Sequence, residues 1–409
     1  MKKIKQTKIL SYISYKLKIP NKTDLNKIIF GKYEIIKKIG QSSYSSVFLG
    51  KYINKKNYVA IKVQDKNAFV SELEKEAYYQ YLLRGFGIPK ILSFGKNRKY
   101  NILVETLLGK TIYEYFTKNK NANTKMKDLC MVAIQIIDRI QYIHSKNIIH
   151  QDIKPENFLV GNPDTSIIYI IDFGLSKKYR SSRTGKLFSF SKNNKFYGTM
   201  NFSSINAMKG YQMSRRDDMI SIGYMLIYLI NGKLPWSILE KGKLERFRKI
   251  LSIKSNTTNE ELCKYLPIEF YEYMNYVKSL KFEEKPNYIY LRKLFLSVLD
   301  GMNDKYDLKF SWIKGKNIKK QNNNLSTMSS LNSYRRKSSP FYNILHNLRE
   351  RSSMNKTMNT ENEIFSNNNN KKKKFFAYKT KDNNYYDKRS ISVGSKQNTV
   401  NNTLNRILW

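Results

Sequence analysis

Cysteine is scarce in this chain, and long apolar runs are absent from it. The only two cysteines among 409 residues are Cys130 and Cys263, and both lie in apolar surroundings of helical spacing. This placement favours buried thiols over a disulfide or a cysteine-ligated metal site, and it is typical of a reducing compartment. No run of eighteen apolar residues occurs, so we expect no membrane-spanning helix.

Signals for export or lipid attachment are also missing. The basic N-terminal segment lacks the apolar core of a signal peptide, the second residue is not glycine, and no cysteine stands near the C-terminus. A secretory leader, a myristoyl group and a prenyl group are therefore not expected. These features predict a soluble monomer of the cytoplasm, the nucleus or both.

Acidic residues are few, because 75 Lys and Arg face only 32 Asp and Glu, a formal net charge of +43. Residues 1–29 carry +7 and residues 313–409 carry +15, which leaves +21 for residues 30–312. A folded domain this basic attracts nucleic acid, anionic membranes, or acidic and phosphorylated proteins. The abundance of Lys, Asn, Ile and Tyr is equally compatible with a coding bias, which would make the charge less informative.

Nucleic-acid binding is the interpretation that rests on charge alone. No stacking or groove-reading motif accompanies the basic residues, so we expect no specific nucleic-acid binding.

Composition divides the chain into three segments. Residues 1–29 form a basic extension, and residues 30–312 carry the apolar periodicity of a folded domain. Residues 313–409 are rich in Asn, Lys and Ser, as in Asn367–Asn370 and Lys371–Lys374. Such a segment buries too little apolar surface to offset its ordering entropy, so we expect a disordered tail.

Within residues 30–312, strand patterns come first and helix patterns follow. We expect strands near residues 33–40, 46–50, 58–63, 91–94 and 101–105, a helix over 69–83, and helices including 217–230, 267–280 and 288–299. This order predicts an α+β fold with a small β-rich lobe of about residues 30–106 and a larger helical lobe of about residues 107–312. A cleft separates two such lobes.

The most informative stretch runs from Ile148 to Val160. A helical apolar run precedes it, and Pro155 ends any helix, so Asp152, Lys154 and Asn157 fall on a tight loop. A carboxylate, an amine and an amide at this spacing suit phosphoryl transfer: the carboxylate accepts a hydroxyl proton, the amine steadies the phosphate and the amide ligates Mg²⁺.

A second motif follows at the expected distance. Asp172, Phe173 and Gly174 come fifteen residues after Asn157, behind an apolar strand over residues 167–171. Asp172 would supply a second metal ligand. The alternative is an ordinary polar loop, but two independent motifs in the right order oppose it.

The smaller lobe offers an amine for the nucleotide phosphates. Lys62 ends the strand Val59–Lys62, and its partner should be a helix carboxylate. Glu72, Glu74 and Glu76 compete for this role. We favour Glu76, which shares a helical face with residues 79 and 83.

The expected phosphate-covering loop is poor in glycine. Residues 40–47 have the length and the closing Val47 of a kinase glycine-rich loop, but only the first glycine, Gly40. Four of the six residues between Gly40 and Val47 are serines, including Ser42 and Ser45. Because a Cβ disfavours positive φ and limits the approach of backbone amides to phosphate, we expect weakened nucleotide binding.

From about Tyr33 to Trp312, the sequence resembles the casein kinase I family of protein kinases. General kinase motifs and several segments typical of this family carry the resemblance. These are residues 142–147, 154–159, 172–180, 204–206, 214–218, 234–236 and 285–292. In particular, Ser204-Ile205-Asn206 stands where most kinases carry Ala-Pro-Glu.

The resemblance implies a bilobal protein-kinase fold and Ser/Thr phosphorylation of acidic or pre-phosphorylated proteins with ATP and Mg²⁺. It makes Asp152, Lys154 and Asn157 catalytic, and gives the metal to Asn157 and Asp172. Asp218 would support the catalytic loop, and residues 106–108 would form the hinge. The nucleotide-binding residues would be Gly40, Ser42, Val47, Ala60, Lys62, Glu76, Leu108 and Leu159.

Three departures from the family pattern qualify this expectation. Gln151 replaces the Arg that gathers an activation-loop phosphate, and Glu105 stands where a bulky apolar gatekeeper is usual, unless the strand is shifted by one residue. Asn201 replaces the Arg that binds a priming phosphate, although Arg246 could retain part of that anion site. The competing hypothesis is a pseudokinase, a basic scaffold with weakened nucleotide binding; the serine-rich loop favours it, and the intact Lys62 and Asp152 oppose it.

Overall fold

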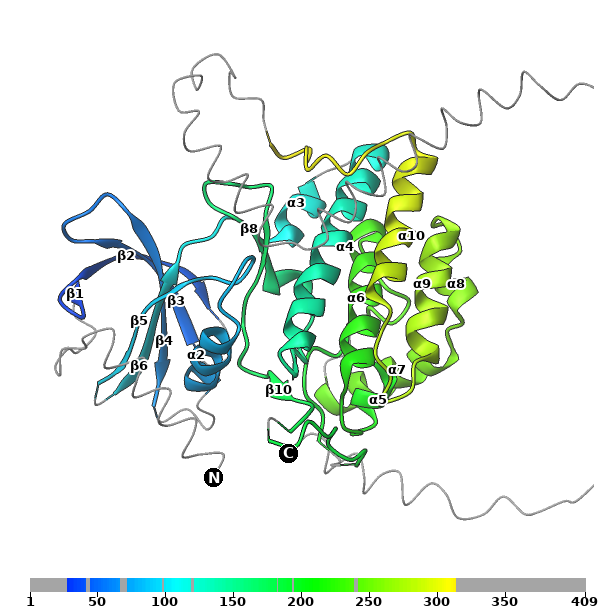
Figure 1. Cartoon of the computed structure of the whole chain (residues 1–409), viewed down its shortest axis with the longest axis horizontal. Coiled ribbons are helices and arrows are strands. Elements are labelled where there is room, and N and C mark those ends of the chain that lie inside the picture. The colour runs from blue at the N-terminus through cyan, green and yellow to red at the C-terminus, as the bar shows by residue number, and fades with distance from the viewer. Residues whose placement is uncertain are drawn as a thin grey trace, which may run out of the picture. The chain divides into compact units, whose positions relative to one another are not determined.

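The computed structural model describes residues 28–41, 45–66, 72–97, 99–118, 121–181, 183–192, 195–238 and 242–313 (Figure 1). Nearly all of the predicted N-terminal extension and the predicted tail beyond Ile313 lie outside these residues. The two boundaries between the three predicted segments and the disorder of the tail therefore stay predictions.

Strands near the start of the described chain form one antiparallel sheet of order β1-β2-β3-β4-β6-β5. Its apolar face comes from alternate residues, as in Val59, Ile61 and Val63 of β4, which are buried together. This alternation is the period of two on which the strand predictions rest. The strands are β1 (Ile28–Ile29), β2 (Tyr33–Gln41), β3 (Ser45–Tyr52), β4 (Tyr58–Asp65), β5 (Ile91–Lys96) and β6 (Tyr100–Thr106).

Helix α2 (Glu72–Leu82) packs against this sheet. Leu73 and Ala77 are buried one turn apart, and Glu72 and Glu74 lie in the first turn, where the helix dipole favours negative charge. The predicted helix over 69–83 is confirmed over Glu72–Leu82, and residues 69–71 lie outside the described chain.

The second half of the described chain is mainly helical, and Figure 1 shows its helices gathered apart from the sheet. Together with the sheet, they confirm the predicted α+β fold of two unlike lobes. The helices are α3 (Ile112–Lys118), α4 (Ala122–Ser145), α5 (Ile205–Met208), α6 (Arg215–Asn231), α7 (Lys243–Asn256), α8 (Asn259–Cys263), α9 (Ile268–Ser279) and α10 (Tyr288–Gly301). Short pieces lie between them: β7 (Ile148–Ile149), the 3-10 turn η1 (Pro155–Asn157), β8 (Phe158–Val160), β9 (Ile168–Ile170) and β10 (Lys177–Lys178).

Helix α4 is central to the helical half and packs on α6 and α10. The side chain of Asn121 caps its first turn by accepting a hydrogen bond from Thr124 N at 3.1 Å. Ile136, Ile140 and Ile143 are fully buried, as their helical spacing predicts. The chain leaves α4 directly into β7 and the polar stretch that follows it.

The loop between α2 and β5 joins the sheet half to α4. Gly87 O accepts a hydrogen bond from Ile170 N at 3.0 Å, and the guanidinium of Arg139 on α4 lies 4.4 Å from the centre of the Phe86 ring. Gly87 has φ +77°, and a Cβ there would come within 1.9 Å of Arg139 Nε. Glycine is therefore required twice, by backbone conformation and by close packing.

Both cysteines are free and buried, as predicted. Burial raises the thiol pKa of Cys130 to about 12 and that of Cys263 to about 11, so neither is a thiolate at neutral pH. In the part of the chain that the structure describes, no helix is long and apolar enough to cross a membrane.

We predict that Gly87→Ala lowers the free energy of unfolding by about 1–3 kcal/mol, because the new Cβ adds a clash to a strained φ. The matched control is Gly185→Ala, at φ +67°, where an added Cβ would have no atom within 4 Å and strain acts without a clash. Urea unfolding of both variants makes the comparison. If both variants lose the same free energy of unfolding, the clash with Arg139 adds nothing to the destabilisation of Gly87→Ala.

Candidate active site

Strand register places the predicted nucleotide residues of the sheet on one face. Gly40 of β2 lies opposite Val47 of β3, and Val47 lies opposite Lys62 of β4. Ala60, two residues before Lys62, lies opposite Glu105 of β6. Residues directly opposite each other in a sheet point to the same side, so these side chains share the face away from the apolar cluster of β4. Ser42 lies outside the described residues.

Lys62 forms a buried ion pair with Glu76, the partner that we favoured. The distance from Nζ to Oε1 is 2.5 Å, and a second carboxylate, Glu105, lies 3.8 Å away. Burial would lower the pKa of Lys62, but Glu76, Glu105 and Asp172 outweigh it and raise the pKa above its usual value. The amine is therefore charged at neutral pH. Of the competitors, Glu74 pairs with Lys96 instead.

The loop after β7 brings Asp152, Lys154 and Asn157 together. Asp152 Oδ2 accepts a hydrogen bond from Lys154 Nζ at 2.5 Å, and its Oδ1 accepts one from Thr199 Oγ1 at 2.7 Å. Asn157 Nδ2 donates to the backbone carbonyl of Asp152 at 2.8 Å, so the amide oxygen is the atom that could ligate the predicted metal. Only 6 % of Asp152 is exposed, so its geometry is set by the protein.

Asp218 on α6 fixes the backbone of this loop by hydrogen bonds. Its two carboxylate oxygens accept hydrogen bonds from His150 N at 2.8 Å and Gln151 N at 2.9 Å. The Nε2 of His144, at the end of α4, lies 2.9 Å from the same carboxylate. Gln151 has φ +72°, a conformation that a non-glycine residue keeps only where its surroundings impose it.

Asp172 comes directly after Ile171, at a second point of positive φ, +64°. Phe173 behind it is fully buried and meets the ring of His150 edge to face at 5.3 Å. Asp172 also contributes to raising the pKa of Lys62 and, after burial, that of Glu72. The carboxylate therefore lies within electrostatic reach of both the lysine and the first turn of α2.

The predicted hinge is an extended connection between β6 and α3. Gly109 N donates to Val160 O at 2.8 Å, and Val160 N donates to Lys110 O at 3.0 Å, which joins the connection to β8. A Cβ on Gly109 would come within 2.6 Å of Val160 Cγ2. Leu108 and Leu159, on these two joined segments, are partly exposed and available to a ligand.

A cavity of about 980 Å³ opens beside the Asp152 loop, where Gln151 and Thr199 line it. Its charged lining residues are one acid, Glu72, and five bases. Such a lining favours an anionic occupant. The five bases are Lys75, Lys177, Lys195, Lys243 and Arg246.

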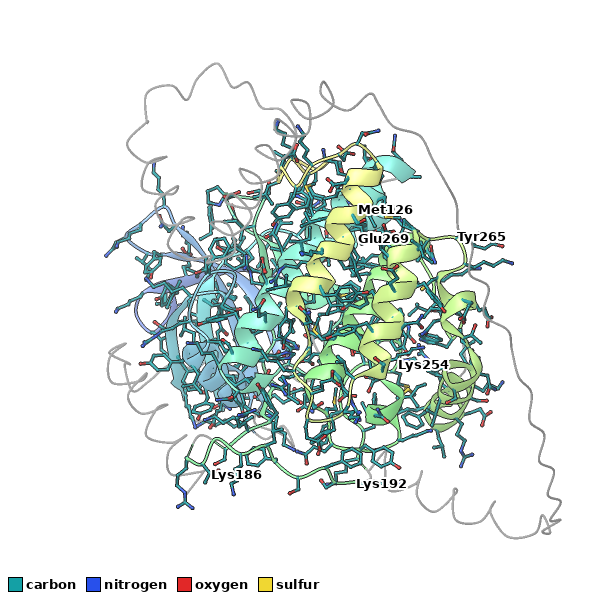
Figure 2. The ribbon with its side chains drawn as sticks, turned by 45° about the vertical axis from the view of Figure 1, so that its right-hand side comes forward. Met126, Lys186, Lys192, Lys254, Tyr265 and Glu269 are labelled. Carbon is teal, nitrogen blue, oxygen red and sulfur yellow. The ribbon has the colours of Figure 1, made fainter. Side chains whose placement is uncertain are left out.

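Lys254 supports one wall of this cavity from inside the helical half (Figure 2). Its Nζ donates to Met200 O at 2.8 Å and Ser203 O at 2.7 Å, and it lies 4.9 Å from the ring centres of both Tyr224 and Trp236. Burial, and then the nearby Lys278, lower the pKa of Lys254 well below its usual value. By contrast, Lys186 and Lys192 in Figure 2 are exposed at the periphery.

The charge balance of the site fits a metal–nucleotide complex. Burial raises the pKa of Glu72, and the negative charges of Asp172 and Asp152 raise it further, against the opposing effect of Lys75 and Lys154. No group of three or more His, Cys, Asp or Glu side chains that could hold a metal occurs in the described ranges. Asn157 and Asp172 would thus need phosphate and water oxygens to complete a magnesium shell, the usual arrangement for that ion.

The sequence analysis did not identify three residues that help to build the candidate site. They are Thr199, Lys254, and Glu72 in its role as a neighbour of Asp172. Thr199 follows Gly198, whose φ of +102° and close approach to Gln151 O leave no room for a Cβ. A glycine-threonine pair before the 204–206 triplet was the available signal. Nothing in the sequence around Lys254 separates it from the many surface lysines.

One comparison with known proteins bears on this geometry. The family model described as "Protein kinase domain" matches residues 33–303 of the chain.

We predict that Lys254→Met lowers the free energy of unfolding by about 1–3 kcal/mol, because it leaves two buried carbonyl groups without their donor. Methionine keeps the length of the side chain, and Lys264→Met, at the exposed end of α8, is the control. Urea unfolding compares the two variants. A Lys254→Met protein as stable as the control would show that Lys254 does not stabilise the backbone at Met200 and Ser203.

A pH dependence follows from His144. Burial lowers its pKa below 6.5, against the opposing effect of Asp218, so the folded ring stays neutral, with Nε2–H donating to Asp218 and Nδ1 accepting from Tyr288. When the pH falls through about 6.5, the unfolded chain binds a proton at His144 that the folded chain does not, and stability falls. Urea midpoints at pH 7.5 and 5.5 should therefore differ less in His144→Gln than in the unsubstituted protein. If the change in urea midpoint between the two pH values is the same in both proteins, His144 is not buried in a neutral state.

Proposed function

Since this chain belongs to the protein kinase family, we propose that it is a serine/threonine kinase, similar to casein kinase I, that phosphorylates acidic or already phosphorylated proteins. The observation that carries the proposal is the arrangement around Asp152. One of its carboxylate oxygens meets Lys154 and the other meets Thr199, next to a cavity lined mainly by bases.

In the proposed reaction, Asp152 orients the substrate hydroxyl and accepts its proton as the oxygen attacks the γ-phosphorus of ATP. The bond from that phosphorus to the β–γ bridging oxygen breaks, and ADP leaves. Lys154 neutralises the charge that develops on the transferred group, and Lys62, held by Glu76, binds the other phosphates. Magnesium held by Asn157 and Asp172 supplies further charge neutralisation when it is bound.

The adenine base is proposed to lie between the two halves of the described chain. Val47 and Ala60 would cover it from the sheet, Leu159 would pack on its other side, and backbone groups near Leu108 would bind its edge. Gly40 and Ser42 would cover the phosphates.

The preference for acidic substrates is supported by the lining of the 980 Å³ cavity. Lys243 and Arg246 come from the start of α7, and both line the cavity. Asn201 lines the same cavity at the position where the resemblance expects an Arg. We therefore propose that Lys243 and Arg246 bind the substrate's acidic or phosphorylated residue.

A pseudokinase is the second candidate, and the single glycine of residues 40–47 favours it. The ion pair between Lys62 and Glu76 and the hydrogen-bonded Asp152 favour catalysis instead. The buried free thiols are compatible with the proposed cytoplasmic or nuclear location.

We predict that Asp152→Asn and Asp172→Asn each lower kcat by about 100-fold or more, since each removes a separate part of the transfer machinery. Radiolabel transfer from ATP to casein measures the effect, and Asp300→Asn, at the exposed end of α10, is the control. Full activity of either variant would remove that residue from the proposed mechanism. No transfer by the unsubstituted protein would favour the pseudokinase.

We predict that Arg246→Gln raises the KM for an acidic peptide about 3- to 10-fold and leaves the KM for ATP unchanged, as expected when one charge of an anion site is lost. The control is Lys249→Gln, an exposed lysine of the same helix that is not among the residues lining the cavity. Salt should reduce the difference by screening. An equal effect of both substitutions would mean that general charge, and not this site, attracts the substrate.

A further inference from the structure

Lys62 has two buried carboxylate partners, and they belong to different kinds of element. Glu76 lies on helix α2 and Glu105 lies on strand β6, at 2.5 Å and 3.8 Å from Nζ. An ammonium group has three N–H donors, so both carboxylates can attract it at the same time. Only 7 % of Lys62, 5 % of Glu76 and 4 % of Glu105 is exposed, which leaves little solvent screening between the three charges.

The position of Glu105 relative to Lys62 is set by backbone hydrogen bonds. Strands β4 and β6 are neighbours in the sheet, with Lys62 opposite Leu103 and Ala60 opposite Glu105. Lys62 and Glu105 are thus diagonal neighbours on one face, within reach of long side chains. Moving them apart would require breaking the ladder between the two strands.

The position of Glu76 depends on α2, which is held against the sheet by side chains. The helix follows β4 after residues 67–71, which lie outside the described chain. Its contacts with the sheet include Leu73 N donating to Gln64 Oε1 at 3.1 Å and the ion pair itself. A shift of α2 would therefore remove Glu76 from Lys62, whereas the backbone of Glu105 would stay in place in the sheet.

Gln80 holds the carboxylate of Glu105 in place. Its Nε2 donates to Glu105 Oε2 at 2.7 Å and to Pro89 O at 3.0 Å. A buried carboxylate is costly unless it is paired and hydrogen-bonded, and Glu105 meets both conditions. The other oxygen, Oε1, is the one that faces Lys62.

We propose that Glu105 is a second positioning residue for Lys62. It keeps the amine directed toward the nucleotide phosphates when the ion pair with Glu76 is broken, so the loss of Glu76 is tolerated better than the loss of both carboxylates. This inference rests on the proposed kinase function, because it assigns the phosphates of ATP to Lys62.

A double-mutant cycle tests the proposal with Glu76→Gln, Glu105→Gln and the double variant, in the full chain. The readouts are the Kd for ATP with Mg²⁺ by calorimetry, and the KM for ATP against kcat. Each single variant should weaken ATP binding less than about 10-fold, and the double variant should weaken it at least about 10-fold beyond the product of the two single effects, as for residues that share a partner. Glu74→Gln, on the same helix but paired with Lys96, is the matched control and should bind ATP normally.

Two results would overturn the proposal. A double variant equal to the product of the single variants would show that Glu105 does not act through Lys62. Tighter ATP binding by Glu105→Gln alone would show that Glu105 draws the amine away from the phosphates.

If thermal unfolding shows that Glu105→Gln does not fold, Glu105→Asp gives the same cycle. It keeps the buried charge and withdraws it by one methylene, and the same two results overturn the proposal. The Kd does not depend on phosphate transfer. A protein that binds ATP but phosphorylates nothing would therefore count against the proposed function, while the cycle would still decide the role of Glu105.

Discussion

The buried carboxylate of Asp218 is the constraint on which the rest of the site depends. It lies near the start of α6, is 1 % exposed, and accepts hydrogen bonds from the backbone of His150 and Gln151. Although burial disfavours its charge, the hydrogen bonds from the His144 ring and from the His150 backbone lower its pKa, so it stays ionised. Because Gln151 is held at positive φ, Asp152 turns toward Lys154 and Thr199.

Buried charge organises the other side of the site in the same way. Lys62 is charged because three carboxylates outweigh its burial, and two of these carboxylates come from elements that are far apart in sequence. Such a cluster adds little net stability, since desolvation offsets much of the attraction between its charges. The cluster instead orients the Lys62 amine. A side chain already held by two carboxylates would lose less conformational entropy on binding a phosphate group.

The loop of residues 198–203 lies between Asp152 and the cavity lined mainly by bases. Thr199 at one end reaches Asp152, and Lys254 and Trp236 hold the carbonyls of residues 200, 201 and 203 from the interior. These hydrogen bonds fix the backbone of the loop, so the loop residues that line the cavity are held in defined positions. In the proposed function, this short backbone segment would couple the geometry of Asp152 to the binding of the substrate.

The sequence by itself determined the α+β architecture, because periods of two and of 3.6 residues report directly on which faces are buried. It also identified Lys62, Asp152, Asn157 and Asp172 as candidate site residues, since these motifs are recognised by residue type and spacing. It favoured Glu76 among three glutamates as the partner of Lys62 without excluding the other two, and it did not separate Lys254 from a surface lysine. Only the tertiary structure decided these points, because a helix can present any of several neighbouring side chains, and burial depends on elements that are distant in the chain. The pairing of Glu105 with Lys62 is of the same kind: strand register, a long-range property, brought the two side chains to one face.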